Sequence, residues 1–243
     1  MLLGVLGGLG PLATVYFMDL LVKMTDAESD QNHIPTLVMN DSDIPDRTDY
    51  ILGKNCESPL PKLEEDAKML EKCGCDYIVI PCNTAHYFYD EVQEQVHVPI
   101  INILEETVKY AYKRNPNIKS IGIMATDGTL KTGSYKKYLD KYGLKQITLS
   151  PENNESLMNI IYNQVKAGKK VDMVEFMRLV VELIRDGSDV VILGCTELSI
   201  INHNNSLTSH MDYIVDSMDV LAEASIRMCG KHVKENYKAC VDL

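Results

Sequence analysis

Two cysteines, Cys82 and Cys195, occupy positions from which a thiol can do acid–base chemistry. Each comes directly after a short apolar run rich in β-branched residues, and each is followed by small polar residues that begin a helical pattern. Unpaired backbone N–H groups at the start of a helix attract anions and favour the thiolate form of a nearby cysteine. Each position therefore offers a base or nucleophile beside a potential carboxylate-binding cradle.

The two cysteines lie in segments of the chain that resemble each other. Residues 74–84 align with residues 187–197, which places Gly on Gly, Asp on Asp and Cys82 on Cys195. A second, weaker resemblance relates the glycine-rich turn at 4–10 to residues 122–128. Internal repetition of this kind indicates two similar structural units. We therefore expect two α/β lobes, each with a turn after its first strand and a cysteine after a later one.

Two opposed thiols suit reactions that remove a proton from one face of a carbon and return a proton to the other, as racemisation does. One base cannot serve both faces, because it cannot cross the plane of the substrate. An ordinary cysteine with a pKa of ~8.5 is only about 3% thiolate at pH 7. Its surroundings must bring that pKa toward neutrality, and hydrogen-bond donors must stabilise the carbanion-like state.

Apolar runs alternate with longer helical patterns, which predicts parallel strands covered by helices on both faces. The segment 201–212 is rich in Asn, Ser and His and is expected to be a surface connection. We expect strands at 2–7, 36–40, 77–81, 100–102, 120–125, 146–149 and 190–194, and helices near 11–25, 60–73, 84–95, 103–114, 129–142, 153–166, 171–186 and 217–236.

The expected fold class is α/β, with two pseudo-symmetric lobes that are each a parallel-sheet α/β sandwich. Residues 1–103 together with 210–243 are expected to form the N-terminal lobe, and 104–209 the C-terminal lobe. In open α/β sheets, ligands bind beyond the carboxyl ends of the strands. The active site is therefore expected in the cleft between the lobes.

The composition is that of a globular protein, with 45% hydrophobic and 24% charged residues. With a formal net charge of −11, the chain lacks the basic surface that binds nucleic acid, so we expect no nucleic-acid partner. The sequence contains no run of 18 apolar residues, so we expect no membrane span. The N-terminal residues lack the pattern of a signal peptide. We accordingly expect a cytoplasmic protein whose seven cysteines are thiols.

The five other cysteines, including Cys240, are interpreted as core or surface thiols without a chemical role. The Cys73-x-Cys75 pair lacks the spacing of common structural zinc sites, and no histidine pair completes it. We therefore expect no metal site.

At these residues the sequence resembles the aspartate/glutamate racemase superfamily, and most closely its cofactor-independent aspartate racemases. The matching motifs lie in family order across most of the chain. They are Gly-Gly-Leu-Gly-Pro-Leu-Ala-Thr at 7–14, Ile-Pro-Asp-Arg-Thr at 44–48, Pro-Cys-Asn-Thr-Ala-His at 81–86 and Gly-Cys-Thr-Glu at 194–197. The resemblance implies a two-lobed fold, no cofactor, a homodimer and a small acidic amino acid as the substrate.

The resemblance also implies roles for particular residues. Cys82 and Cys195 would be the two acid–base thiols, Arg47 would bind the side-chain carboxylate of the substrate, and Lys166 would assist it. Other residues would contact the substrate or line the site. Asn83, Thr84 and Thr196 would bind its α-carboxylate and ammonium groups, Thr126 and Thr129 would line the site, and Gly8 would close its floor.

The residue types agree with these roles. A dicarboxylic amino acid needs cations in an otherwise acidic protein, and the guanidinium of Arg47, in a Pro-flanked loop, can hold a carboxylate bidentately. His86 lies four residues after Cys82, so a helix would place both on one face, where the histidine could tune the thiol or only support packing. Glu197 could orient a neighbour or simply begin a helix, where acidic residues are favoured.

Three alternative functions remain open at this point. The scaffold could serve a glutamate or broad-specificity racemase, since one methylene group is discriminated by only ~1–3 kcal/mol. Residues 8–13 match the dinucleotide fingerprint G-x-G-x-x-A, although the acidic residue at a strand end, Asp41, comes about ten residues later than the ~20 expected. A non-catalytic ligand-binding module is disfavoured, because binding alone needs neither thiol.

Overall fold

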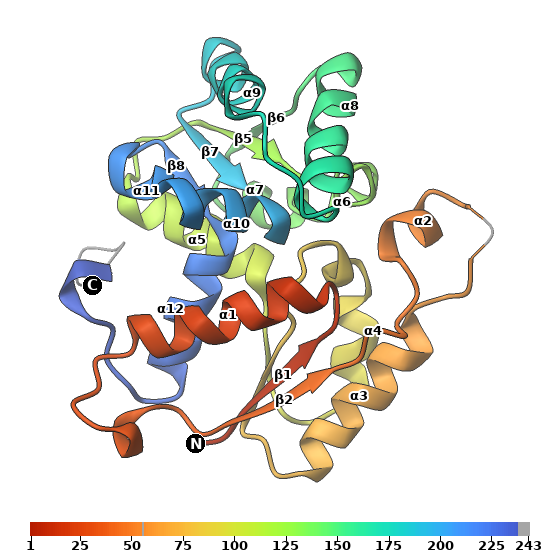
Figure 1. Cartoon of the computed structure of the whole chain (residues 1–243), viewed down its shortest axis with the longest axis vertical. Helices are drawn as coiled ribbons and strands as arrows, with labels where there is room; N and C mark the ends of the chain where they lie inside the picture. Colours follow the sequence, from red (N-terminus) through yellow and green to blue (C-terminus); the bar gives the residue numbers. More distant parts are fainter. Residues whose placement is uncertain (55, 238–243) are drawn as a thin grey trace.

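The computed structural model describes residues 1–54 and 56–237, and the chain forms two four-stranded parallel sheets with helices packed on them. Figure 1 shows the sheet that contains β1 and β2 in the lower lobe and the sheet that contains β5 to β8 in the upper lobe. The expected α/β class with two lobes is confirmed.

The first lobe is built from strands that alternate with helices, as the sequence pattern predicts. Its elements are β1 (Leu3–Gly7), α1 (Pro11–Met24), η1 (Asp30–Asn32), β2 (Thr36–Asn40), α2 (Arg47–Ile51), α3 (Leu60–Lys72), β3 (Tyr77–Val79), η2 (Thr84–Phe88), α4 (Tyr89–Glu94) and β4 (Ile100–Ile101).

Helix α5 (Ile103–Arg114) leads into the second lobe, and helix α12 (Ser217–Met228) follows it. The second lobe contains β5 (Ser120–Met124), α6 (Asp127–Thr132), α7 (Lys136–Lys141), β6 (Lys145–Ile147), α8 (Pro151–Asn159), η3 (Ile160–Val165), α9 (Met173–Arg185), β7 (Val190–Leu193), α10 (Thr196–Asn205), α11 (Leu207–His210) and β8 (Ile214–Asp216), and a short turn, η4 (Glu235–Tyr237), comes after α12.

The two sheets have the same topology, in agreement with the internal repetition of the sequence. Their strand orders are β2-β1-β3-β4 and β6-β5-β7-β8, so β3 and β7 occupy equivalent places. Strand β8, at Ile214–Asp216, pairs with β7 and belongs to the second sheet. The sequence pattern had led us to expect all of 210–243 in the first lobe. Helix α12 then packs against α5 and α1, and Figure 1 shows it beside α1.

Several expected elements have different bounds. Most of 201–212 is helical rather than a surface connection, because Ile201 and Leu207 are 1% and 5% exposed and anchor α10 and α11 in the core. The expected helix 129–142 is divided at Gly133, whose backbone is left-handed with φ of 62°. Arg47 begins a short helix rather than lying in a loop, because Asp46 caps the N–H of Asp49.

The two lobes share one hydrophobic core. A continuous cluster of buried side chains includes Leu3 and Val5 of the first sheet, Ile121 and Ile123 of the second, and residues of α1, α5 and α12. Burial of this apolar surface stabilises the lobes as a single unit. No helix in the described part of the chain is long and apolar enough to span a bilayer.

Candidate active site

A cavity at the carboxyl ends of both sheets brings together most of the candidate site residues. It has a volume of about 20 Å³, which is room for roughly one water molecule. An amino acid can therefore enter only if the walls of the cavity separate. The candidate residues in its lining are Arg47, Cys82, Asn83, Thr84, Thr126, Lys166, Cys195, Thr196 and Glu197.

Each cysteine reaches this cavity from an equivalent place in its lobe. Cys82 follows β3 and Cys195 follows β7, and each side chain is 5% exposed. Cys195 is also the residue at the N-cap of α10. The matched placement that the sequence repeat predicts thus delivers one thiol from each lobe to the same space.

The thiol of Cys195 is held by a neighbouring carboxylate. Its Sγ donates a hydrogen bond to Oε2 of Glu197 over 2.9 Å, and the hydroxyl of Thr196 donates to the same oxygen over 3.3 Å. Burial raises the pKa of Cys195 well above its usual range, and the charge of Glu197 adds to this effect. Cys195 is therefore a protonated thiol at neutral pH.

Lys166 supplies a positive charge on the other side of Glu197. Its Nζ lies 3.8 Å from Oε1 of Glu197 and 4.2 Å from the centre of the Tyr162 ring. Partial burial opposes the charge on Lys166, whose side chain remains partly exposed, but Glu197, Tyr162, Cys195 and Asp46 together outweigh it, so the pKa of Lys166 is raised. The lysine remains an ammonium ion inside the cavity lining.

A π-helical turn positions this lysine. η3 (Ile160–Val165) extends α8 with a wider helical repeat and ends directly before Lys166. π-helical turns are rare and occur frequently at functional sites. The turn places Tyr162 and Lys166, four residues apart, in the lining of the same cavity.

Arg47 is a buried cation without a carboxylate partner among the described residues. The residue is 8% exposed. Its guanidinium donates hydrogen bonds to the backbone carbonyls of Leu9 over 3.0 Å and Pro45 over 3.1 Å. Its Nε is buried and has no hydrogen-bond partner among those residues. A buried guanidinium of this kind can bind a carboxylate ligand by donating hydrogen bonds to it.

Three threonine hydroxyls from the two lobes meet next to Cys82. Oγ1 of Thr84 lies 3.0 Å from Oγ1 of both Thr126 and Thr129, which are 3.2 Å apart. Thr126 also caps α6 by accepting from the N–H of Thr129. The cluster joins the lobes, with Thr84 and Thr126 in the cavity lining and Thr129 behind them.

The side-chain amide of Asn83 is occupied by the protein. Its Oδ1 accepts from the hydroxyl of Tyr135 over 2.6 Å, and its Nδ2 donates to Oγ of Ser217 over 3.0 Å. Gly194 permits this arrangement, because a Cβ there would lie 3.2 Å from the Tyr135 ring. These two hydrogen bonds fix the orientation of the Asn83 amide in the cavity lining.

His86 supports the Cys82 turn from outside the cavity. Its Nδ1 lies 2.8 Å from the carbonyl oxygen of Cys82, and its Nε2 lies 3.2 Å from the backbone N–H of Ile103. Since a carbonyl accepts and an N–H donates, Nδ1 carries the proton and Nε2 accepts. Burial lowers the pKa of His86 to about 4, so the ring is neutral.

Gly8 lies outside the cavity lining, which its neighbour Leu9 reaches instead. Its φ is 92°, and a Cβ there would lie 2.0 Å from the carbonyl oxygen of Asp41. Glycine is required here because the backbone passes so close to Asp41. This packing gives the first glycine of the apparent dinucleotide fingerprint a structural reason.

Sequence reasoning did not single out four other lining residues, which are Leu9, Asp46, Thr48 and Tyr162. Tyr162 had a usable signal, because it precedes Lys166 by four residues and a helical segment places such residues on one face. The described residues contain no group of three or more His, Cys, Asp or Glu side chains able to hold a metal ion. Cys240 lies outside the described residues.

Comparisons with known proteins show the family of this chain and its fold. A sequence model of the Asp/Glu/hydantoin racemase family matches residues 6–225. The structure is similar to that of an aspartate racemase from Picrophilus torridus, with a TM-score of 0.78, 29% identity and coverage of 98% of both chains.

Two sequence relatives extend the comparison. The broad-specificity amino-acid racemase RacX of Bacillus subtilis is 27% identical over 93% of this chain and 96% of its own length. A glutamate racemase from Aquifex pyrophilus is 38% identical over 80 residues, about a third of each chain.

The fold, the paired thiols and the family match together define the class: this chain belongs to the Asp/Glu/hydantoin racemase family. It is accordingly a racemase, an isomerase that inverts a stereocentre.

Proposed function

We propose that this chain interconverts L- and D-aspartate without a cofactor, using Cys82 and Cys195 as the two acid–base groups. The observation that carries the proposal is that one cavity is lined by a thiol from each lobe and by the unpaired cation Arg47. The similarity to the Picrophilus torridus aspartate racemase over almost the whole chain supports aspartate as the substrate.

The raised pKa of Cys195 supports Cys82 as the base in one direction of the reaction. Because Glu197 holds Cys195 as a thiol, the thiolate of Cys82 would break the Cα–H bond and form its own S–H bond. The electron pair left on the α-carbon would be delocalised into the α-carboxylate. The Cys195 S–H bond would then break as a new Cα–H bond forms on the opposite face, which leaves a Cys195 thiolate that Lys166 stabilises. The reverse reaction starts from that state.

Arg47 would distinguish aspartate from amino acids without a side-chain carboxylate. Hydrogen bonds to charged groups contribute ~1.5–3 kcal/mol each. Losing about 2 kcal/mol of this binding in the transition state lowers kcat/KM roughly 30-fold. We expect Arg47→Met to lower kcat/KM for aspartate by at least that factor while leaving any slow turnover of alanine unchanged. Equal losses for both substrates would remove Arg47 from substrate recognition.

The decisive experiment incubates the protein with L-aspartate in D₂O without added cofactor and separates the enantiomers by chiral chromatography. D-aspartate with deuterium at the α-carbon is expected. Cys82→Ala and Cys195→Ala should each abolish the reaction, whereas Cys229→Ala, a buried cysteine outside the cavity, should not. Near-normal turnover by either active-site variant would overturn the two-thiol mechanism.

A broad-specificity racemase is the second candidate, because RacX is similar over nearly the whole length of both chains. The same assay with L-glutamate, L-alanine and L-lysine separates the two. A preference for aspartate over each of them supports the proposal. Comparable turnover of several would assign broad specificity instead.

A further inference from the structure

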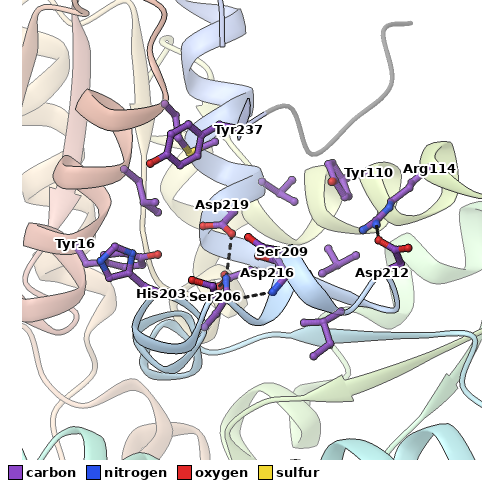
Figure 2. Close-up of a pocket in the computed structure, with 17 residues that line it drawn as sticks. Tyr16, Tyr110, Arg114, His203, Ser206, Ser209, Asp212, Asp216, Asp219 and Tyr237 are labelled. Atoms are coloured by element: carbon purple, nitrogen blue, oxygen red, sulfur yellow. Dashed lines mark hydrogen bonds and ion pairs between the residues drawn. The ribbon is translucent and has the colours of Figure 1, made fainter. Parts of the chain in front are cut away.

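A second, larger cavity lies between α1, α5, α10 and α12, with a volume of about 650 Å³. Figure 2 shows the side chains that line it. None of them lines the cavity that contains the thiols. Helix α10 connects the two spaces, because Glu197 near its start lines the first and Asn202 and His203 near its end line the second.

Two carboxylates form the acidic part of this cavity. Asp216 accepts hydrogen bonds from the hydroxyl of Ser199 over 2.5 Å and from Nδ2 of Asn202 over 2.9 Å. The same Nδ2 lies 3.1 Å from Oδ2 of Asp219, the single hydrogen bond that the Asp219 carboxylate receives from the described residues. Figure 2 labels Asp216 and Asp219 among the lining side chains.

The charge of these carboxylates is not balanced by a protein cation. Among residues 1–54 and 56–237, neither Asp216 nor Asp219 forms an ion pair, and the Arg114 at the rim is already paired with Asp212 over 3.0 Å. Burial raises the pKa of both carboxyls, and the nearness of Asp216 raises that of Asp219 further. A bound cation would oppose both effects and favour the ionised form of these carboxyls.

The hydroxyl of Tyr16 is a second, independent indication of a ligand. Tyr16 is only 8% exposed, and its ring packs against His203 with the ring centres 4.9 Å apart. Its hydroxyl has no hydrogen-bond partner within the described part of the chain, and Figure 2 shows it pointing into the cavity. A phenolic hydroxyl that faces a cavity without a protein partner is available to donate to or accept from a bound molecule.

The remaining walls suit an organic molecule rather than a bare metal ion. Leu20, Met24 and Val220 contribute apolar surface, and the volume falls within the ~300–1,000 Å³ typical of small-molecule sites. The described residues contain no cluster of three or more metal-ligating side chains. Aromatic rings such as that of Tyr16 also attract ammonium groups.

We propose that this second cavity binds a primary alkylammonium ligand. The ammonium group would donate to the Asp219 carboxylate and the Tyr16 hydroxyl, and the alkyl chain would lie against Leu20 and Val220. The site is separate from the thiol cavity, so the proposal does not depend on which amino acid is racemised.

Isothermal titration of the full chain with 1,5-diaminopentane tests this proposal, with hexanoate as a ligand of similar length and opposite charge. We expect the diamine to bind and hexanoate not to bind. Asp219→Asn should weaken diamine binding roughly tenfold or more, and Tyr16→Phe, which keeps the packed ring, roughly fivefold. Asp140→Asn removes the same charge from an exposed position on α7, away from both cavities, and should change nothing.

Three results would overturn the proposal. These are no diamine binding at about 10 mM, equal affinity in the wild type and in Tyr16→Phe, or displacement of the diamine by aspartate, which would place it in the thiol cavity. Tyr16→Phe and the aspartate competition keep the test decisive if Asp219→Asn does not fold. Loss of racemase activity alone would not affect these measurements.

Discussion

The neutral, buried His86 should make the free energy of unfolding depend on pH. Its pKa is lowered by burial to about 4 in the folded chain, whereas an unfolded histidine titrates near 6.5. Between these values the unfolded chain binds the proton more readily than the folded chain. Stability from this group is therefore complete above pH 6.5 and is lost as the pH falls toward 4.

The size of the effect follows from the two pKa values. A difference of about 2.5 pKa units corresponds to about 3 kcal/mol, of which about 2 kcal/mol is already lost at pH 5. His86→Gln removes the titrating ring. We therefore expect the stability difference between the wild type and this variant to shrink by about 2 kcal/mol between pH 7.5 and pH 5.

Urea unfolding followed by circular dichroism at the two pH values measures this difference directly. Comparing the two proteins cancels the other titrating groups, including the buried aspartates. His210→Gln, a change at an exposed histidine, is the matched control and should follow the wild type at both pH values. If the wild type and His86→Gln lose equal stability between the two pH values, the folded chain does not hold His86 as a buried neutral ring, and the prediction is wrong.

Two further predictions concern the thiol and the glycine turn. Glu197→Gln removes the charge that helps raise the pKa of Cys195. Alkylation of Cys195 by iodoacetamide at pH 8, followed by mass spectrometry, should therefore be faster than in the wild type. An unchanged rate would contradict the assigned role of Glu197. Gly8→Ala should destabilise the chain by roughly 3 kcal/mol or more, because its Cβ would overlap the Asp41 carbonyl. Gly143→Ala, also at positive φ but facing open space, should cost only about 1–2 kcal/mol in thermal unfolding, and equal losses would show that the Asp41 contact is unimportant.

Much of the fold was predictable because its signals are local. The alternation of apolar runs with helical patterns indicated parallel sheets, and the repeated segments around Cys82 and Cys195 indicated two equivalent lobes. Strand β8 was missed because three residues carry too little pattern, and its pairing with β7 defines it as a strand. Helices α10 and α11 were missed because burial of Ile201 and Leu207, rather than the polar composition of the segment, determines their structure.

The sequence by itself determined the residue types available for chemistry and the strand ends that carry them, since both depend on neighbours along the chain. Only the tertiary structure decided what each side chain does. It turned the Asn83 amide toward Tyr135 and Ser217, placed Glu197 against the Cys195 thiol, and left Arg47 without a protein carboxylate. The Asn83 contacts join residues far apart along the chain, and the burial that raises the pKa of Cys195 arises only when the elements pack together. Packing, added to the local contact with Glu197, therefore sets the protonation and reach of the site.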